Sequence, residues 1–342
     1  MRANECFTKE FFSAGDALTD ILGQGEAKDQ LRAALLTKRH VIIVGPPGVG
    51  KTTLAKNVAS RLEPLELAAC ALRCSSADEP CFECKAKPQR KRLFKGPERF
   101  IRVQGSPDLT AEDLLGDIDP LKALQHGPTS IEAFTPGKIF RANHGVLFFD
   151  EVNRCPEKLQ NALLQALEER RVTIGSYDVD LPADFFFIGT MNPEDTSTEK
   201  LSDVFADRFD MIYMGYPETQ QLEVDIVKRK ASPAPAVIPE DLLQLAVGFV
   251  RQLRQSDKLE KKPSVRASIG LVERMSADAH LQGAKQAGIE HLQRCIRSVL
   301  AHRIRLKPSV RYLQSASAFL DQAFTDYQRE LEKRLGKPGG YL

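Results

Sequence analysis

Residues 40–62 read HVIIVGPPGVGKTTLAKNVASRL. The run at 40–44 is short and β-branched, which predicts a buried strand. Residues 45–52 match the pattern G-x-x-x-x-G-K-[ST] in full, and residues 53–62 have the composition of a helix. A strand, a glycine loop and a helix in direct succession predict a phosphate-binding loop at a helix N-terminus.

The residue types of this loop suit the phosphates of a nucleotide. Glycines allow successive backbone N–H groups to turn inward, Lys51 supplies a positive charge to the β- and γ-phosphates, and Thr52 offers a hydroxyl to Mg²⁺. The predicted nucleotide-binding residues are Gly45, Pro46, Pro47, Gly48, Val49, Gly50, Lys51, Thr52 and Thr53.

Similar apolar runs recur further along the chain, at 100–103, 145–149 and 185–189. Helical patterns lie between them, and the clearest spans 156–171. Strands that alternate with helices predict an α/β fold, with a parallel sheet covered by helices on both faces.

Two carboxylates follow the run at 145–149 directly. Asp150 and Glu151 are therefore expected at the carboxyl end of a buried strand, where ligands bind in open α/β sheets. Asp150 would hold Mg²⁺ through water, and Glu151 would act as the general base that polarises the attacking water. The alternative is a solvated turn, and the neighbouring phosphate loop favours the catalytic interpretation.

The run at 185–189 leads into Asn192. An uncharged amide at this place can position a water near the γ-phosphate, and a plain Asn-Pro turn explains the same residues equally well. No Asn-Lys-x-Asp string for guanine occurs in the sequence, so a small GTPase is disfavoured.

Strand patterns end near Tyr216 and Pro217, which bounds a first domain at 1–217. Residues 218–239 are proline-rich in part and are predicted to be a linker. The helical domain expected at 240–335 is built from four periodic segments, and residues 336–342 are expected to form a flexible tail. The four segments are 240–256, 265–284, 289–306 and 315–335.

Composition limits the class of protein. The 342 residues are 42% hydrophobic and 27% charged, and the longest apolar runs are far shorter than the roughly 20 residues of a membrane span. The polar start has no signal-peptide pattern, so the cytoplasm is expected and a membrane partner is not. Residues 251–342 carry 18 Lys and Arg against 9 Asp and Glu, and this basic C-terminal part suits solvated helix faces and subunit contacts or, less well, nucleic acid.

Four of the seven cysteines stand together in the spacing Cys70-x3-Cys74-x6-Cys81-x2-Cys84. Four thiolates this close would satisfy a tetrahedral Zn²⁺ ion and fold an insertion at about 67–100 that lacks a core of its own. An iron–sulfur cluster, a redox dithiol and unligated thiols remain open alternatives. Basic residues follow the cysteines, and aromatic residues for base stacking are nearly absent there.

Five motifs in order carry a family resemblance. They are GPPGVGKT at 45–52, FFDEVNR at 148–154, LLQALEERRVTIG at 163–175, GTMNPED at 189–195 and FADRFD at 205–210. Together they resemble an AAA+ ATPase of the helix-2-insert clade, which contains MoxR-type ATPases and the small ATPase subunit of magnesium chelatase. The resemblance covers residues from about 21 to about 306.

This resemblance implies a role for single residues. Lys51 and Thr52 match Walker A, Asp150 and Glu151 match Walker B, and Asn192 matches sensor 1. Arg208 matches the arginine finger that is offered to a neighbouring subunit, Arg266 matches sensor 2, and Gln24 lies in the segment that resembles the one beside the adenine.

Two of these positions have a plain structural alternative. Arg208 could pair locally with Asp207 or Asp210, and Arg266 could be an ordinary exposed helix arginine. The resemblance also implies a helix-2 insert at about 105–140 and a hairpin before sensor 1 at about 171–181, with Gly175 at its turn. Both segments would contact a client, although an ordinary loop and hairpin would have the same patterns.

The expected protein is an ATP-hydrolysing ring subunit that uses ATP and Mg²⁺. The resemblance implies a homo-oligomeric ring, a hexamer, and a partner protein with a von Willebrand factor A domain, as in metal chelatases and MoxR systems. The alternative functions are a nucleic-acid-stimulated motor or loader and a non-catalytic scaffold, and the presence of Glu151 argues against the scaffold.

Overall fold

A computed structural model describes residues 6–13, 15–174, 179–193, 201–232 and 235–335. They form two compact units, Met1–Pro46 with Gly50–Met214 and Pro47–Val49 with Gly215–Leu342. The turn expected at Gly175 and the tail expected at 336–342 lie outside the described residues. Among the helices that are described, each is too short or too polar to cross a lipid bilayer.

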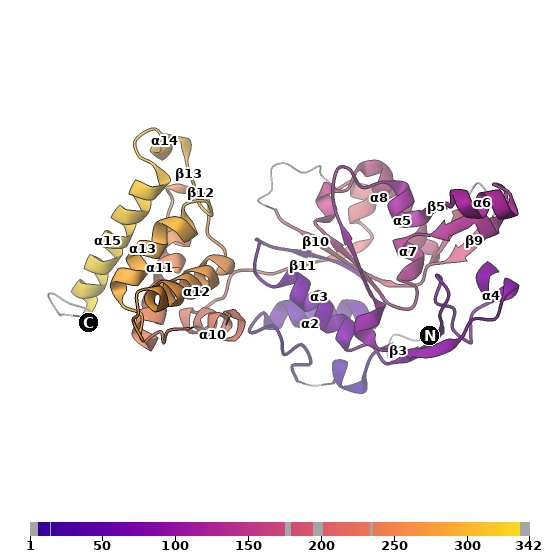
Figure 1. The fold of residues 1–342 in the computed structure, drawn as a ribbon, viewed down its shortest axis with the longest axis horizontal. Helices are drawn as coiled ribbons and strands as arrows, with labels where there is room; N and C mark the ends of the chain where they lie inside the picture. The colour runs from indigo at the N-terminus through magenta and orange to yellow at the C-terminus, as the bar shows by residue number, and fades with distance from the viewer. Residues whose placement is uncertain (1–5, 14, 175–178, 194–200, 233–234, 336–342) are drawn as a thin grey trace. The chain divides into compact units, whose positions relative to one another are not determined.

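The first unit is built on a five-stranded sheet in the order β11-β1-β10-β7-β4, in which every neighbouring pair is parallel (Figure 1). Its strands are β1 (His40–Val44), β4 (Phe100–Gln104), β7 (Val146–Asp150), β10 (Phe186–Met191) and β11 (Phe209–Tyr213). The expected α/β fold with a parallel sheet is confirmed. The fifth strand, β11, was not anticipated as a strand from the sequence.

Helices cover both faces of this sheet, because the central strands are apolar on both sides. On one face, Ile42, Leu147 and Phe149 pack in one cluster with Leu159 and Leu163 of α8 (Glu157–Glu169). On the other face lie α2 (Gly25–Leu36) and α3 (Lys51–Ser60). The unit also contains short elements, namely η1 (Lys9–Phe11), η2 (Gly96–Arg99), η4 (Val152–Arg154) and α9 (Asp203–Ala206).

Three insertions extend from the sheet. The first pairs β2 (Leu65–Ala68) with β3 (Lys91–Phe94) and carries α4 (Phe82–Ala86) between them. The second falls between β4 and β7 and holds α5 (Ala111–Leu115), β5 (Gly116–Ile118), α6 (Pro120–His126), η3 (Ile131–Ala133), β6 (Phe134–Pro136) and α7 (Lys138–Arg141). The third pairs β8 (Arg171–Ile174) with β9 (Val179–Pro182).

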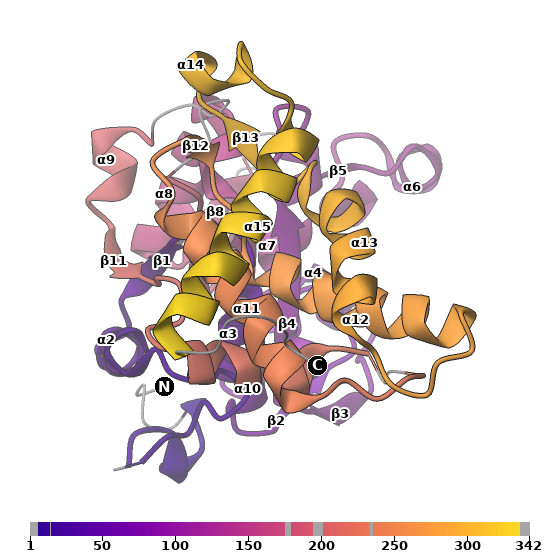
Figure 2. The same ribbon diagram turned by 90° about the vertical axis from the view of Figure 1, so that its left-hand side faces the viewer.

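The second unit is helical (Figure 2), and its buried apolar side chains form one large cluster and one smaller cluster. Its elements are α10 (Gln220–Lys230), α11 (Glu240–Gln255), β12 (Leu259–Lys261), α12 (Val265–Leu281), α13 (Ile289–Leu300), β13 (Arg305–Leu306), α14 (Pro308–Arg311) and α15 (Ala316–Leu335). Two expectations are corrected. Residues 218–239 are not only a linker, because they contain α10, and the helix expected at 289–306 ends at Leu300.

A buried ionic group holds α10 in this unit. The carboxylate of Glu223 is fully buried and receives two hydrogen bonds from Arg254, at 2.6 and 2.7 Å. The hydroxyl of Ser268 donates a third at 2.5 Å, and Arg251 lies 3.3 Å away. These partners come from α11 and α12, so the charged group links three helices, and apolar residues of α10 also pack against these two helices.

Replacement of Glu223 by Ala should destabilise the second unit by about 3 kcal/mol, because Arg254 would be left buried without its counter-charge. Urea unfolding followed by circular dichroism would measure the loss. The matched control is Glu240→Ala, which removes an exposed pair with Lys228 and should cost no more than about 1 kcal/mol. Equal effects from the two variants would contradict the assignment.

Candidate active site

The glycine loop follows β1 and leads into α3. Gly50 caps α3 in the left-handed region, at φ 104°, a conformation that glycine adopts without steric cost. A Cβ on Gly45 would lie only 2.2 Å from the carbonyl oxygen of Met214, so no larger residue fits there. The loop therefore has the backbone geometry of a phosphate cradle at a helix N-terminus.

The Lys51 ammonium lies back over the loop. Its Nζ donates hydrogen bonds to the carbonyl oxygens of Gly45 at 2.5 Å and Pro46 at 2.9 Å. Thr52 and Thr53 follow in the first turn of α3 and are half-buried. The Lys51 ammonium and the two threonine hydroxyls thus lie where α3 begins, as a triphosphate site requires.

Asp150 and Glu151 are joined by a residue that the sequence analysis did not single out. The hydroxyl of Thr190, fully buried on β10, donates to Asp150 Oδ1 at 2.7 Å and accepts from the Glu151 backbone N–H at 2.9 Å. The backbone of Glu151 adopts the left-handed conformation, at φ 57°. This conformation is uncommon outside glycine, and residues that adopt it are concentrated at functional sites. One hydroxyl thus fixes both carboxylate residues.

Edge strand β4 supplies further contacts to this pair. Arg102 Nη2 lies 2.6 Å from Asp150 Oδ2, and the amide of Gln104 donates to Glu151 Oε2 at 3.2 Å. Arg102 is one of the basic residues that follow the cysteines in the sequence. Arg99, another of them, is buried and donates to the His144 carbonyl oxygen at 2.6 Å. The basic run is therefore partly used inside the unit.

Asn192 and Gln24 lie near the loop. Met191, which precedes Asn192, accepts a hydrogen bond from the Gly45 N–H at 3.1 Å, so Asn192 leaves the sheet beside the glycine loop. Gln24 caps α2, three residues after Ile21, whose side chain approaches Gly50 closely enough to exclude a Cβ there. The structure thus brings Lys51, Asp150, Glu151 and Asn192 to the carboxyl edge of the sheet, with Gln24 close by.

Arg208 lies at the amino ends of the strands, on the side of the sheet opposite the glycine loop. It immediately precedes β11, and the pairing of His40 with Phe209 and of Val44 with Tyr213 places it one strand length from the loop, about 15 Å. Its guanidinium donates to the Val204 carbonyl oxygen at 2.7 Å and forms an ion pair with Glu168. The alternative that the sequence offers for Arg208 is a local ion pair with Asp207 or Asp210, and the structure shows a different acidic partner. Asp210 instead binds Arg39.

Arg266 belongs to the second unit. It is exposed in the first turn of α12. That position agrees both with a lid arginine and with an ordinary solvated helix residue.

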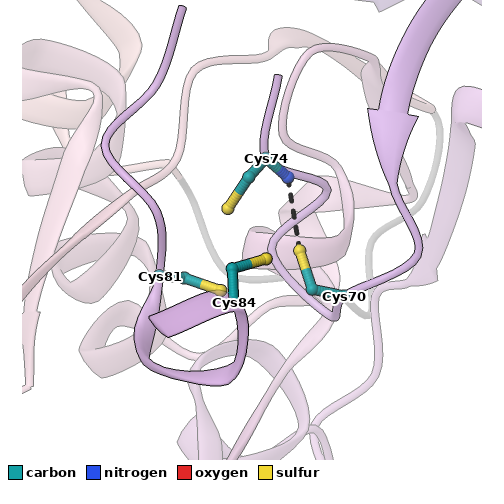
Figure 3. A group of neighbouring side chains, drawn as sticks. All are labelled: Cys70, Cys74, Cys81 and Cys84. Atoms are coloured by element: carbon teal, nitrogen blue, oxygen red, sulfur yellow. Dashed lines mark hydrogen bonds between the residues drawn. The ribbon is translucent and has the colours of Figure 1, made fainter. Parts of the chain in front are cut away.

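The four clustered cysteines meet in the β2–β3 insertion (Figure 3). Hydrogen bonds from the thiols of Cys74 and then Cys81 lower the pKa of Cys70, and the bond to Cys70 raises the pKa of Cys74. Burial is the main cause that raises the pKa of Cys84 to about 12. The pKa of Cys70 is thus lowered, whereas the pKa values of the other three cysteines are raised.

Comparison with known families covers most of the chain. The family described as magnesium chelatase, subunit ChlI, matches residues 17–100, the ATPase family associated with various cellular activities (AAA) matches 94–211, and the AAA lid domain matches 251–322. These three matches follow one another along both units. The chain is an AAA+ ATPase.

Curated relatives of this AAA+ ATPase are distant but extensive. An uncharacterized Bacillus subtilis protein, YeaC, is 28% identical and covers 82% of each chain. A magnesium-chelatase subunit ChlI homolog from Methanocaldococcus jannaschii is 28% identical over 85% of this chain and 86% of its own. The Mycobacterium tuberculosis chaperone MoxR1 is 29% identical over 66% of this chain and 50% of its own.

Among solved structures, a mutant of Thermotoga maritima RuvB has a TM-score of 0.50 at 20% identity and covers 83% of this chain and 73% of its own. This likeness concerns the fold. The AAA+ ATPase uses ATP with Mg²⁺, and the carboxyl edge of its sheet offers the cation, hydroxyl, carboxylate and amide groups that such chemistry requires.

Replacement of Thr190 by Val keeps the shape of the side chain and removes the hydroxyl that holds Asp150 and Glu151. We expect kcat for ATP hydrolysis to fall about tenfold, because the partly buried Asp150 carboxylate loses a hydrogen bond, with little change in the Kd for ATP. Steady-state hydrolysis and binding of a fluorescent ATP analogue separate the two effects. An unchanged kcat would show that this hydroxyl does not position the pair.

Proposed function

We propose that this AAA+ ATPase couples Mg-ATP hydrolysis to the remodelling of a partner protein. Lys51 and Thr52 bind the phosphates and Mg²⁺, Asp150 holds the metal through water, and Glu151 activates the attacking water. Asn192 orients that water, and Arg266 senses the nucleotide from the lid.

The observation that carries this proposal is an exposed apolar surface on the insertion between β4 and β7. In α6, the side chains of Leu121 and Leu124 are 72% and 85% exposed, and no residue of this helix is buried. Their spacing of three residues places them on one helix face. Large apolar side chains displayed together in this way mark a surface for protein contact.

The relatives support the same class of function. One is named a magnesium-chelatase subunit ChlI homolog and another a chaperone, MoxR1. From the resemblance to metal chelatases and MoxR systems, we infer that the client is a protein that carries a von Willebrand factor A domain. Metal insertion into a tetrapyrrole is the form that this activity would take in a chelatase.

A ring of identical subunits, a hexamer, completes the proposal. Arg208 stands one strand length from the glycine loop of its own chain and cannot reach the phosphates that this loop would bind. As an arginine finger it can act only on a neighbouring subunit, where it would stabilise charge on the γ-phosphate. Leaving Glu168 costs little, since exposed ion pairs contribute at most about 1 kcal/mol.

Mixing two inactive variants tests the shared site. Lys51→Ala removes phosphate binding and Arg208→Ala removes the finger, so each alone should hydrolyse ATP at least 100-fold more slowly than the parent. In an equal mixture, about a quarter of the interfaces pair an intact loop with an intact finger, and activity should recover in proportion. No recovery after verified subunit exchange would contradict a finger in trans.

Partner capture tests the remodelling function. Tagged Glu151→Gln should hold ATP without hydrolysing it and retain the partner, whereas Lys51→Ala should not. Adding Leu121→Glu and Leu124→Glu to the trap should abolish capture. The matched control adds Leu281→Glu, a side chain of similar exposure in the second unit, and should leave capture intact.

The identity of the captured molecule decides between functions. A von Willebrand A-domain protein that appears only with the trap supports remodelling. Retention of nuclease-sensitive DNA or RNA, with ATPase stimulation that falls steeply with salt, would replace it with a nucleic-acid motor.

A further inference from the structure

The cysteine cluster has no part in the nucleotide chemistry and needs an explanation of its own. Cys70 and Cys74 lie in the loop after β2, whereas Cys81 and Cys84 lie at the start of α4 and within it. Figure 3 shows the four side chains directed toward one another from these two segments. None of the four is in a disulfide.

The distances match a single tetrahedral ion. All four Sγ atoms lie within 4.8 Å of one another. A Zn–S bond of about 2.3 Å in a tetrahedron sets neighbouring sulfurs about 3.8 Å apart, so small side-chain movements close the site. An iron–sulfur cluster places two or more irons and sulfide between its thiolates and requires a wider cage.

The insertion lacks the apolar side chains that would order it otherwise. Between residues 69 and 90, the only buried side chains are Leu72 and three of the cysteines, Cys70, Cys74 and Cys81. Helix α4 has no buried residue at all. Ala71 and Phe82 are only partly buried against the core of the unit. Ordering this much backbone has a large entropic cost that these few apolar contacts do not offset, whereas metal–thiolate bonds supply folding free energy directly.

Hydrogen bonds around the sulfurs already hold the ligand segments. The Cys74 N–H donates to Cys70 Sγ at 3.3 Å, and the Ala71 N–H donates to a carboxylate oxygen of Glu83, at 2.9 Å, which joins the two cysteine pairs. Supporting contacts of this kind orient the ligands of protein metal sites.

The ligand loop is also fastened to the first unit. The amide of Asn143 donates to the Leu72 carbonyl oxygen at 2.9 Å, and His144 Nε2 lies 2.6 Å from Asp78 Oδ2. Both residues lie just before β7, at the edge of the sheet opposite the glycine loop. The cluster can therefore stabilise the unit without contacting the nucleotide site.

We infer that Cys70, Cys74, Cys81 and Cys84 bind one Zn²⁺ ion in a closed tetrathiolate site that folds the insertion between β2 and β3. Four protein ligands leave no position open for water or substrate, so the ion is structural. Binding releases the remaining thiol protons to solvent.

Metal analysis of the purified full chain tests this. The parent should contain about one Zn²⁺ per chain and no iron. Cys84→Ser should weaken zinc binding at least 100-fold in competition with a chromophoric chelator, and Cys84→His, which restores a ligand, should recover most of it. Cys6→Ser, at a thiol that is likewise half-buried, is the matched control and should keep the metal.

A second measurement separates metal loss from misfolding. Lys85 and Arg90 of the insertion have exposed side chains, and zinc removal should unfold the backbone there and make it cleavable by trypsin, while binding of a fluorescent ATP analogue persists. A parent chain that neither contains nor binds zinc, or a Cys84→Ser chain that keeps it, would overturn the inference. One iron per chain with thiolate-to-iron absorption would also overturn it.

Discussion

Strands β1, β10 and β7 run parallel and end side by side, and the nucleotide site depends on this arrangement. Each strand delivers its next residues to the same edge, so that the glycine loop, Asn192 and the two carboxylates meet without any long connection between them. The Thr190 hydroxyl then sets their relative positions across the β7–β10 pair. A shift of one residue between these strands would turn Thr190 to the other face and separate the acids from their support.

Charge is used differently in the two units. In the nucleotide unit, Asp150 and Glu151 have polar partners at the end of β4 but stay partly exposed, which leaves them accessible to a cation and to water. In the helical unit, Glu223 is fully buried in an ion pair with Arg254 and joins helices to one another. The contrast follows from cost, because an enclosed charge must be paired permanently, whereas a partly solvated one can exchange partners.

Local patterns predicted what depends on consecutive residues, including the glycine loop, the strands at 40–44 and 145–149 and most of the helical segments. They did not reveal Thr190, Arg102 or Gln104, because the roles of these residues come from the register between strands distant in sequence. The same reason explains why Arg208 binds Glu168 rather than its neighbours Asp207 or Asp210. Helix α10 was missed because its stability comes from Glu223 and its partners in α11 and α12.

The pair between Arg208 and Glu168 has a consequence for communication along the chain. Glu168 is in the last turn of α8, three residues before strand β8 of the hairpin begins. In the proposed ring, Arg208 would leave Glu168 to reach a neighbour's triphosphate, and the end of α8 would then lose this ion pair next to the base of the hairpin. The presence of ATP in one subunit would thereby affect α8 and the β8–β9 hairpin of the neighbouring subunit through a single side chain.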